Sequence, residues 1–172
     1  MGYESNRSIF VTLNKKEKEV FEILSRTIYE EDEKTGGDED IAMHIKATAK
    51  YGVTIADKIV KCLIDLRKND FLQNLEAYTV APDGTIDYNE DLTKNYDDGA
   101  LELVIAYSLE PGHFGYSTYT GEDSEHWGYC FGRTSDNKIY LLDLDARIVF
   151  KIRESPHNPI PEEIKKWARE NL

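Results

Sequence analysis

The chain has 172 residues, of which 40% are hydrophobic and 31% are charged, and its formal net charge is −12. This length suits one ordinary domain, and the composition is typical of a globular protein and not of a disordered one. The negative charge disfavours nucleic acid as a ligand for the whole surface and favours a basic protein partner, which it would attract over long range.

Neither a membrane segment nor a disulfide framework is expected. No apolar run approaches the roughly 18 residues that a membrane span needs, and the opening MGYESNRSIF lacks the pattern of a signal peptide. Cys62 and Cys130 are the two cysteines of the chain, which is too few for a disulfide scaffold. We therefore expect a cytoplasmic protein with reduced thiols.

The first 70 residues predict three helices. Asn14 followed by Glu17 is close to a capping box, and an apolar residue then recurs every four positions. A second helix, ending at Gly52, is expected to turn three apolar residues inward. These are Ile41, Ile45 and Ala49. A third helix begins at Thr54 and should be the most buried of the three. Its apolar face comprises Ile55, Ile59, Leu63 and Leu66, thickened by Val60 and Ile64.

From about residue 75 the apolar residues repeat every second position, which is typical of strands. The segment 75–88 predicts a hairpin, and ALELVIAYSL, at 100–109, predicts the strongest strand. Further strands are expected at 113–120, 126–133, 139–144 and 147–152. Pro161 occupies the first position of a closing helix.

The order of these elements predicts an α+β fold. It combines an N-terminal three-helix segment, an antiparallel β-meander of about six to seven strands and a C-terminal helix. We expect a single domain over residues 1–172, with a helical half at about 12–72, a sheet half at about 75–153 and the last helix at about 161–172.

The stretch HWGYCFG, at 126–132, contains the residue types of a catalytic pair. On a strand, however, His126 and Cys130 would lie about 13 Å apart, too far for a nucleophile and its base. A symmetric hairpin would place Thr120 opposite His126 and Tyr116 opposite Cys130. We therefore predict no enzyme activity. Both hairpin faces carry aromatic residues, so one face serves the core and the other is either covered by helices or exposed for binding.

Residues 87–98 place acidic side chains at positions 1, 5 and 12 of a calcium loop, but Leu92 stands where that loop needs glycine. Asp143 and Asp145 fit two solvent-facing acids better than a catalytic pair. No metal and no cofactor are therefore expected.

One alternative is a winged-helix DNA-binding regulator formed by residues 14–88. Residues 41–68 hold six bases against two acids, and Lys58 and Lys61 would face outward on the helix that reads DNA. The hairpin that would form the wing is acidic, however, and would repel phosphates.

The pattern as a whole favours a small acidic, non-enzymatic protein that binds and neutralises a basic protein, such as a toxin or a nucleic-acid-binding enzyme. Immunity proteins, antitoxins and anti-defence proteins are of this class. Acids in loops would steer the partner and tyrosines would anchor it. The residues expected to bind the partner are Asp87, Tyr88, Asp91, Tyr96, Asp97, Asp98, Tyr116, Tyr119, Glu122, Asp123 and Glu125.

Overall fold

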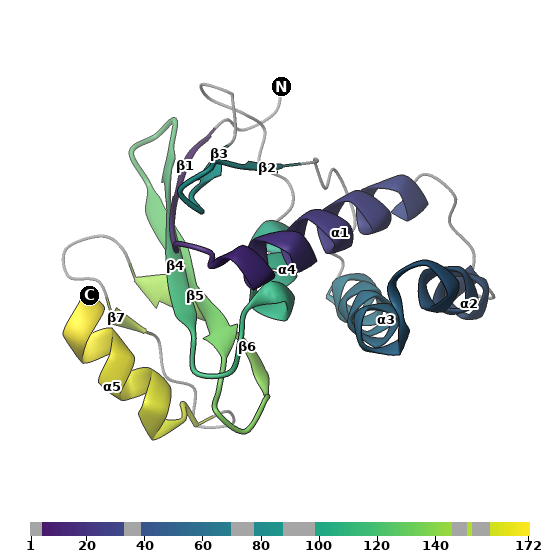
Figure 1. Ribbon diagram of the computed structural model, residues 1–172. Coiled ribbons are helices and arrows are strands. Elements are labelled where there is room, and N and C mark those ends of the chain that lie inside the picture. The colour runs from purple at the N-terminus through teal and green to yellow at the C-terminus, as the bar shows by residue number, and fades with distance from the viewer. Residues whose placement is uncertain (1–4, 33–38, 70–77, 88–98, 146–150, 153–158) are drawn as a thin grey trace.

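A computed structural model describes residues 5–32, 39–69, 78–87, 99–145, 151–152 and 159–172 (Figure 1). These residues form five helices and seven strands. The helices pack on both faces of an antiparallel sheet, so the α+β class expected from the sequence is confirmed. Among the described helices, none is both long enough and apolar enough to cross a membrane.

The main sheet has five antiparallel strands in the order β1-β4-β5-β6-β7. Their bounds are β1 Ser5–Phe10, β4 Phe114–Gly121, β5 His126–Arg133, β6 Ile139–Asp145 and β7 Lys151–Ile152. A separate two-stranded sheet pairs β2 (Thr79–Val80) with β3 (Ile86–Asp87). The main sheet is smaller than the predicted meander, and its edge strand β1 comes from a segment for which no element was expected.

The β4–β5 hairpin has the register predicted from the sequence. Thr120 pairs with His126, and Tyr116 pairs with Cys130. Gly128 lies opposite Thr118 and has no room for a side chain, because a Cβ there would lie 2.1 Å from the Ser117 carbonyl oxygen. The glycine thus allows close approach of the two strands.

The five helices are α1 Lys15–Asp32, α2 Glu39–Tyr51, α3 Val53–Lys68, α4 Ala100–Ser108 and α5 Glu162–Asn171. The capping box of α1 is present: the Asn14 amide donates to Glu17 Oε2 at 2.9 Å, and the Glu17 amide donates to Asn14 Oδ1 at 3.0 Å. Glu17 is buried. Its carboxylate therefore fixes the start of α1 from inside the protein.

Residues 100–108 form a helix, so the strand predicted at 100–109 is wrong. Gly99, with φ 95°, adopts a left-handed conformation just before α4, and every residue of α4 is buried. The helix packs between the sheet strands β5 and β6 on one side and α1 and α3 on the other. A helix enclosed on all sides carries apolar residues on every face, and in α4 only Glu102 and Ser108 are clearly polar. Such a sequence also satisfies a two-residue alternation.

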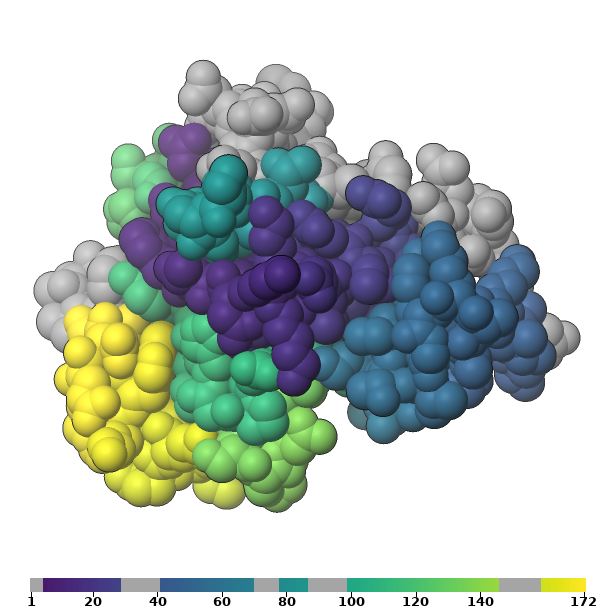
Figure 2. All heavy atoms as spheres, viewed as in Figure 1, coloured from purple at the N-terminus to yellow at the C-terminus, as the bar shows by residue number. Residues whose placement is uncertain are grey.

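The second helix also differs from expectation. α2 packs against α3 through Met43 and Ala47, which are buried, whereas Ile41 and Ile45 are 70% and 65% exposed. The predicted inward face is therefore the outer face. Figure 2 shows α2 and α3, in blue, as a lobe beside α1. α3 buries its predicted positions Ile59, Leu63 and Leu66, but Ile64 is 47% exposed.

The sheet is covered on both faces. One face packs against α4, with α1 and α3 beyond it, in the larger hydrophobic core. The other carries Phe114, Cys130 and Leu142, which pack against Ile164 and Trp167 of α5 in a smaller core. Of the two possibilities for the second aromatic face, coverage by a helix is the one found for these residues (Figure 1).

Candidate functional site

The expected partner-binding residues fall into three groups. Tyr88, Asp91, Tyr96, Asp97 and Asp98 lie outside the described residues. Asp87 belongs to β3, where its backbone pairs with that of Thr79. Two tyrosines and three acids of the β4–β5 hairpin are fully described, and their positions can be compared.

The acids Glu122, Asp123 and Glu125 all lie exposed in the turn between β4 and β5. The turn is closed by a hydrogen bond from the Gly121 amide to the Glu125 carbonyl at 2.9 Å. Ser124 occupies its left-handed position, with φ 62°. The compact turn thus places three exposed acidic residues at one end of the sheet.

The two tyrosines do not share a surface. Tyr119 is only 2% exposed and donates a hydrogen bond to the buried Glu102 at 2.6 Å, on the face that α4 covers. Tyr116, three residues away, points to the opposite face of the sheet, as strand geometry requires. Tyr119 therefore belongs to the interior in this structure, and Tyr116 belongs to a partly open surface.

Tyr116 contributes to an aromatic groove between β1, β4 and α5, which we call the outer groove. Its ring stacks on Phe10 with centroids 4.5 Å apart, and Trp167 lies 6.3 Å from it. The groove has a volume of about 610 Å³, and Phe10 is 46% exposed. Neither Phe10 nor Trp167 was among the residues predicted from the sequence to bind the partner.

Cys130 and His126 occupy unlike surroundings. Cys130 is buried, and burial raises the pKa of its thiol to about 12, whereas a reactive cysteine needs a lowered pKa. His126 is exposed, with Nδ1 3.2 Å from the Thr120 hydroxyl. Within the described part of the chain, no three His, Cys, Asp or Glu side chains are grouped to hold a metal ion.

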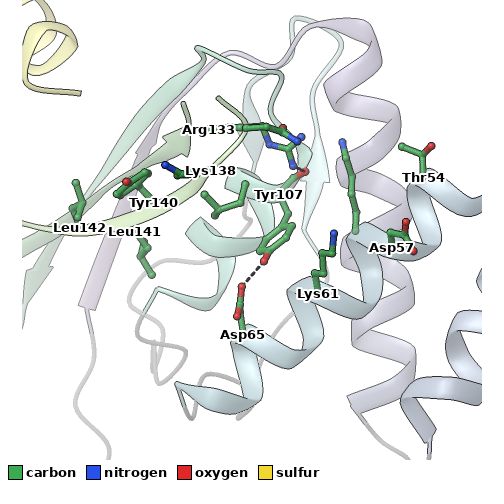
Figure 3. Close-up of a pocket in the computed structure, with 13 residues that line it drawn as sticks. Thr54, Asp57, Lys61, Asp65, Tyr107, Arg133, Lys138, Tyr140, Leu141 and Leu142 are labelled. Carbon is green, nitrogen blue, oxygen red and sulfur yellow. Dashed lines mark hydrogen bonds between the residues drawn. The ribbon is translucent and has the colours of Figure 1, made fainter. Parts of the chain in front are cut away.

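A second concave surface, the basic cleft, lies between α3 and the β5–β6 hairpin, with Tyr107 of α4 at its base (Figure 3). Its volume is about 740 Å³. It is lined by four bases and two acids, although the protein as a whole is acidic. These are Lys58, Lys61, Arg133, Lys138, Asp57 and Asp65.

Arg133 is the least exposed base of the cleft. It ends β5, is 7% exposed, and donates a hydrogen bond from its guanidinium to the Tyr107 carbonyl at 2.8 Å. Its Nε has no hydrogen-bond partner among the described residues. Burial lowers the pKa of the guanidinium. The side chain nevertheless stays charged, because the pKa of arginine is far above neutrality.

Lys58 carries the second positive charge of the cleft. Its side chain is half-buried, and no described residue forms an ion pair with it. Desolvation, followed by repulsion from Arg133, lowers the pKa of Lys58 to about 8. The winged-helix alternative expected this lysine to face outward on a DNA-reading helix, whereas here it is half-buried in the basic cleft.

The acids of the cleft are already engaged. Asp65 accepts a hydrogen bond from the Tyr107 hydroxyl, and burial together with this hydrogen bond raises the pKa of that tyrosine. Asp57 lies 3.0 Å from His44 of α2. Lys138 pairs with Asp136 at 2.8 Å. Arg133 and Lys58 are thus left without a carboxylate partner among the described residues.

Comparison of the chain with protein-family models, curated proteins and solved structures finds no match.

Proposed function

We propose that the protein is a non-enzymatic binding protein that takes up a basic protein partner on the outer groove and the acidic β4–β5 turn. The observation that carries this proposal is the exposed Phe10 ring stacked on Tyr116 in the outer groove. Large aromatic side chains in partly open pockets are the usual anchors of protein interfaces. The acids of the turn would steer the partner toward this anchor.

A single partner can span both features. Tyr116, Thr118 and Thr120 follow one another on one face of β4, and the strand leads directly into the acidic turn. Tyr116 and Glu122 are six positions apart along an extended chain, which is about 20 Å. An interface of ordinary size buries about 800 Å² on each partner and is therefore roughly 30 Å across.

The net charge of −12 supports a basic partner, such as a toxin or a nucleic-acid-binding enzyme. A neutraliser of this class works by covering the partner's functional surface and needs no chemistry of its own. The DNA-binding alternative has less support, because it requires Lys58 to be displayed outward and Lys58 is half-buried in the basic cleft.

The proposal is tested by capturing the partner from native cells on the tagged protein and then measuring its association and dissociation rates. Replacement of Glu122, Asp123 and Glu125 with serine should slow association about tenfold at low salt and leave dissociation nearly unchanged. Phe10→Ser should instead speed dissociation, with a loss of about 2 kcal/mol or more in binding free energy.

A second triple replacement serves as the control, because it changes the net charge by the same amount at other places on the surface. It replaces Glu19, Asp143 and Glu162, which are exposed acids on α1, β6 and α5. Serine at these positions should affect association far less than serine in the turn. Joint replacement of Lys58 and Lys61 with alanine should leave partner binding unchanged. Binding of a labelled DNA duplex that depends on these two lysines would overturn the proposal.

A further inference from the structure

We propose that the basic cleft is a binding site for a small phosphate-bearing molecule, whose phosphate group is held between Arg133 and Lys58. This site is separate from the partner-binding surface, because it lies between α3 and the β5–β6 hairpin and shares no lining residue with the outer groove. A test of phosphate binding at this site is therefore independent of any test of the proposed function.

The first argument is uncompensated charge. Arg133 is more than nine-tenths buried, and no described carboxylate lies within ion-pair distance of its guanidinium. Lys58 is half-buried beside it, equally without an ion pair, although 33 acids are available in the sequence. Burying charges without a counter-charge is unfavourable. A bound anion would supply the missing negative charge.

The second argument is the geometry of the donors. Arg133 points from the end of β5 toward α3, and Lys61 rises from α3 on the far side of the same space (Figure 3). Arg133 donates one hydrogen bond from Nη2 to the Tyr107 carbonyl, and its Nε is buried without a partner among the described residues, so the donors left for a ligand are the other N–H groups at the end of the guanidinium. An arginine with free donors on its planar fork binds two phosphate oxygens at once, and a lysine beside it adds a compact positive charge.

The third argument separates phosphate from a simple carboxylate. Two adjacent positive charges match a dianion better than a monoanion, and Lys61, one turn after Lys58 on the same side of α3, adds a third. Asp65 and Asp57 keep their negative charges, but their carboxylates contact Tyr107 and His44 and form no ion pair with Arg133 or Lys58. Bound phosphate would also favour the charged form of Lys58.

The rest of the lining fits the organic part of a small molecule. β6 contributes two apolar side chains on the face of the sheet that carries Arg133, namely Ile139 and Leu141. The volume of about 740 Å³ lies within the range of small-molecule sites, which is about 300–1,000 Å³. A macromolecular phosphate backbone is not the expected ligand, because the surrounding protein is strongly acidic.

The test is a titration of the protein at pH 7 and constant ionic strength with inorganic phosphate, phenyl phosphate and benzoate, followed by phosphorus NMR and by the unfolding temperature. Both phosphates should bind saturably, and phenyl phosphate should bind about tenfold more tightly, since its ring can contact the β6 side chains. Benzoate should bind most weakly. Tighter binding of benzoate than of phenyl phosphate would overturn the assignment of the ligand.

Three variants locate the site. Arg133→Met and Lys58→Met should each weaken phenyl phosphate binding at least tenfold, whereas Lys46→Met should leave it unchanged. Lys46 is a matched control because it is an exposed lysine on α2 outside the cleft. Lys58→Met keeps the test decisive if Arg133→Met fails to fold. The proposal would be overturned if Lys58→Met bound phenyl phosphate as tightly as Lys46→Met and the unmodified protein do. It would also be overturned if the unmodified protein showed no saturable binding.

Discussion

Two buried arginines on the inner face of the sheet show two ways of holding a positive charge in a protein interior. Arg7 of β1 is 3% exposed, and its guanidinium carbon lies 5.0 Å from the ring centre of Tyr119 and 5.6 Å from that of Tyr78. It also donates a hydrogen bond to the Tyr78 hydroxyl at 2.6 Å. Arg133, 7% exposed, lies at the far end of the face and opens on a cleft.

The difference lies in what offsets the charge. Aromatic faces attract a cation, and this attraction is strongest where water is excluded, so Arg7 is stabilised by the protein itself. Arg133 has a backbone carbonyl as its described hydrogen-bond partner, and Lys58 adds repulsion. Arg7 thus has the surroundings of a structural residue, and Arg133 those of a residue that awaits an anion.

Substitution of an apolar core residue gives a loss of unfolding free energy with which the two arginine substitutions can be compared. Leu63 of α3 is 1% exposed, and Leu63→Ala should lower the free energy of unfolding by about 2–5 kcal/mol because it leaves a cavity. Ile64→Ala, at the next position but 47% exposed, should cost less than about 1 kcal/mol. Urea unfolding measures both. Similar losses would show that the core face of α3 is misplaced.

The two arginines should respond differently to the same substitution. Arg7→Met should cost about 2–4 kcal/mol, because it removes a buried hydrogen bond and cation–π contacts. Arg133→Met should change the stability of the ligand-free protein by less than about 1 kcal/mol, because the lost hydrogen bond is offset by relief of an unpaired buried charge. Urea unfolding in phosphate-free buffer measures the free energy of unfolding of both variants. An equal loss for both would show that the two arginines do not differ in how their charge is stabilised.

A further prediction concerns pH. The pKa of Lys58 is lowered from 10.5 to about 8. Between these values the folded protein has released the proton that the unfolded chain still binds, so this group makes stability rise with pH, and below pH 8 its full cost is present. Lys58→Met should remove that rise.

The two cysteines act in the opposite direction. Burial raises the thiol pKa of Cys62 and Cys130 above the ordinary value of 9.0, so their contribution to stability is lost as pH rises above that value. Since Lys58→Met retains both thiols, the stability of the unmodified protein minus that of the variant isolates the lysine. A difference that stays constant from pH 7.5 to pH 10.5 would show that the pKa of Lys58 is ordinary.

The sequence predicted local patterns well where a short turn defines them. In the β4–β5 hairpin, strand alternation and the compact turn together determine which residues pair. The register of the whole hairpin, from the pair Phe114–Gly132 to the pair Thr120–His126, could therefore be predicted from the sequence. The same holds for the capping box of α1, whose two partners lie three residues apart. In both cases the interacting residues are near neighbours along the chain.

The prediction from sequence failed where an element is buried on all sides, because the spacing of its apolar residues then no longer distinguishes a helix from a strand. α4 is enclosed by other elements, so its apolar residues repeat at every period and a strand fitted them equally well. α2 carries apolar residues on two faces, and only its packing on α3 shows that Met43 and Ala47 are the buried ones. Local sequence does not encode which face a neighbouring element will cover.

The candidate sites were predicted only in part, for the same reason. The exposed turn acids follow from a local pattern, but the basic cleft joins Lys58 to Arg133, which is 75 positions further along the chain, and the outer groove joins Phe10 to Tyr116 and Trp167. Such pairs become visible only when the topology is known. The one signal in the sequence was the local excess of bases at 41–68.

The position of β1 at the edge of the sheet has a consequence for how the protein is made. Ser5 pairs with Gly121, so the strand synthesised first must wait for a partner more than a hundred residues later. At a translation rate of about 5–20 residues per second, that delay is roughly 5–20 s. Closing so long a loop is also entropically slow. We therefore expect β1 to dock late, with Arg7 and Phe10 reaching their aromatic neighbours only after the rest of the sheet exists.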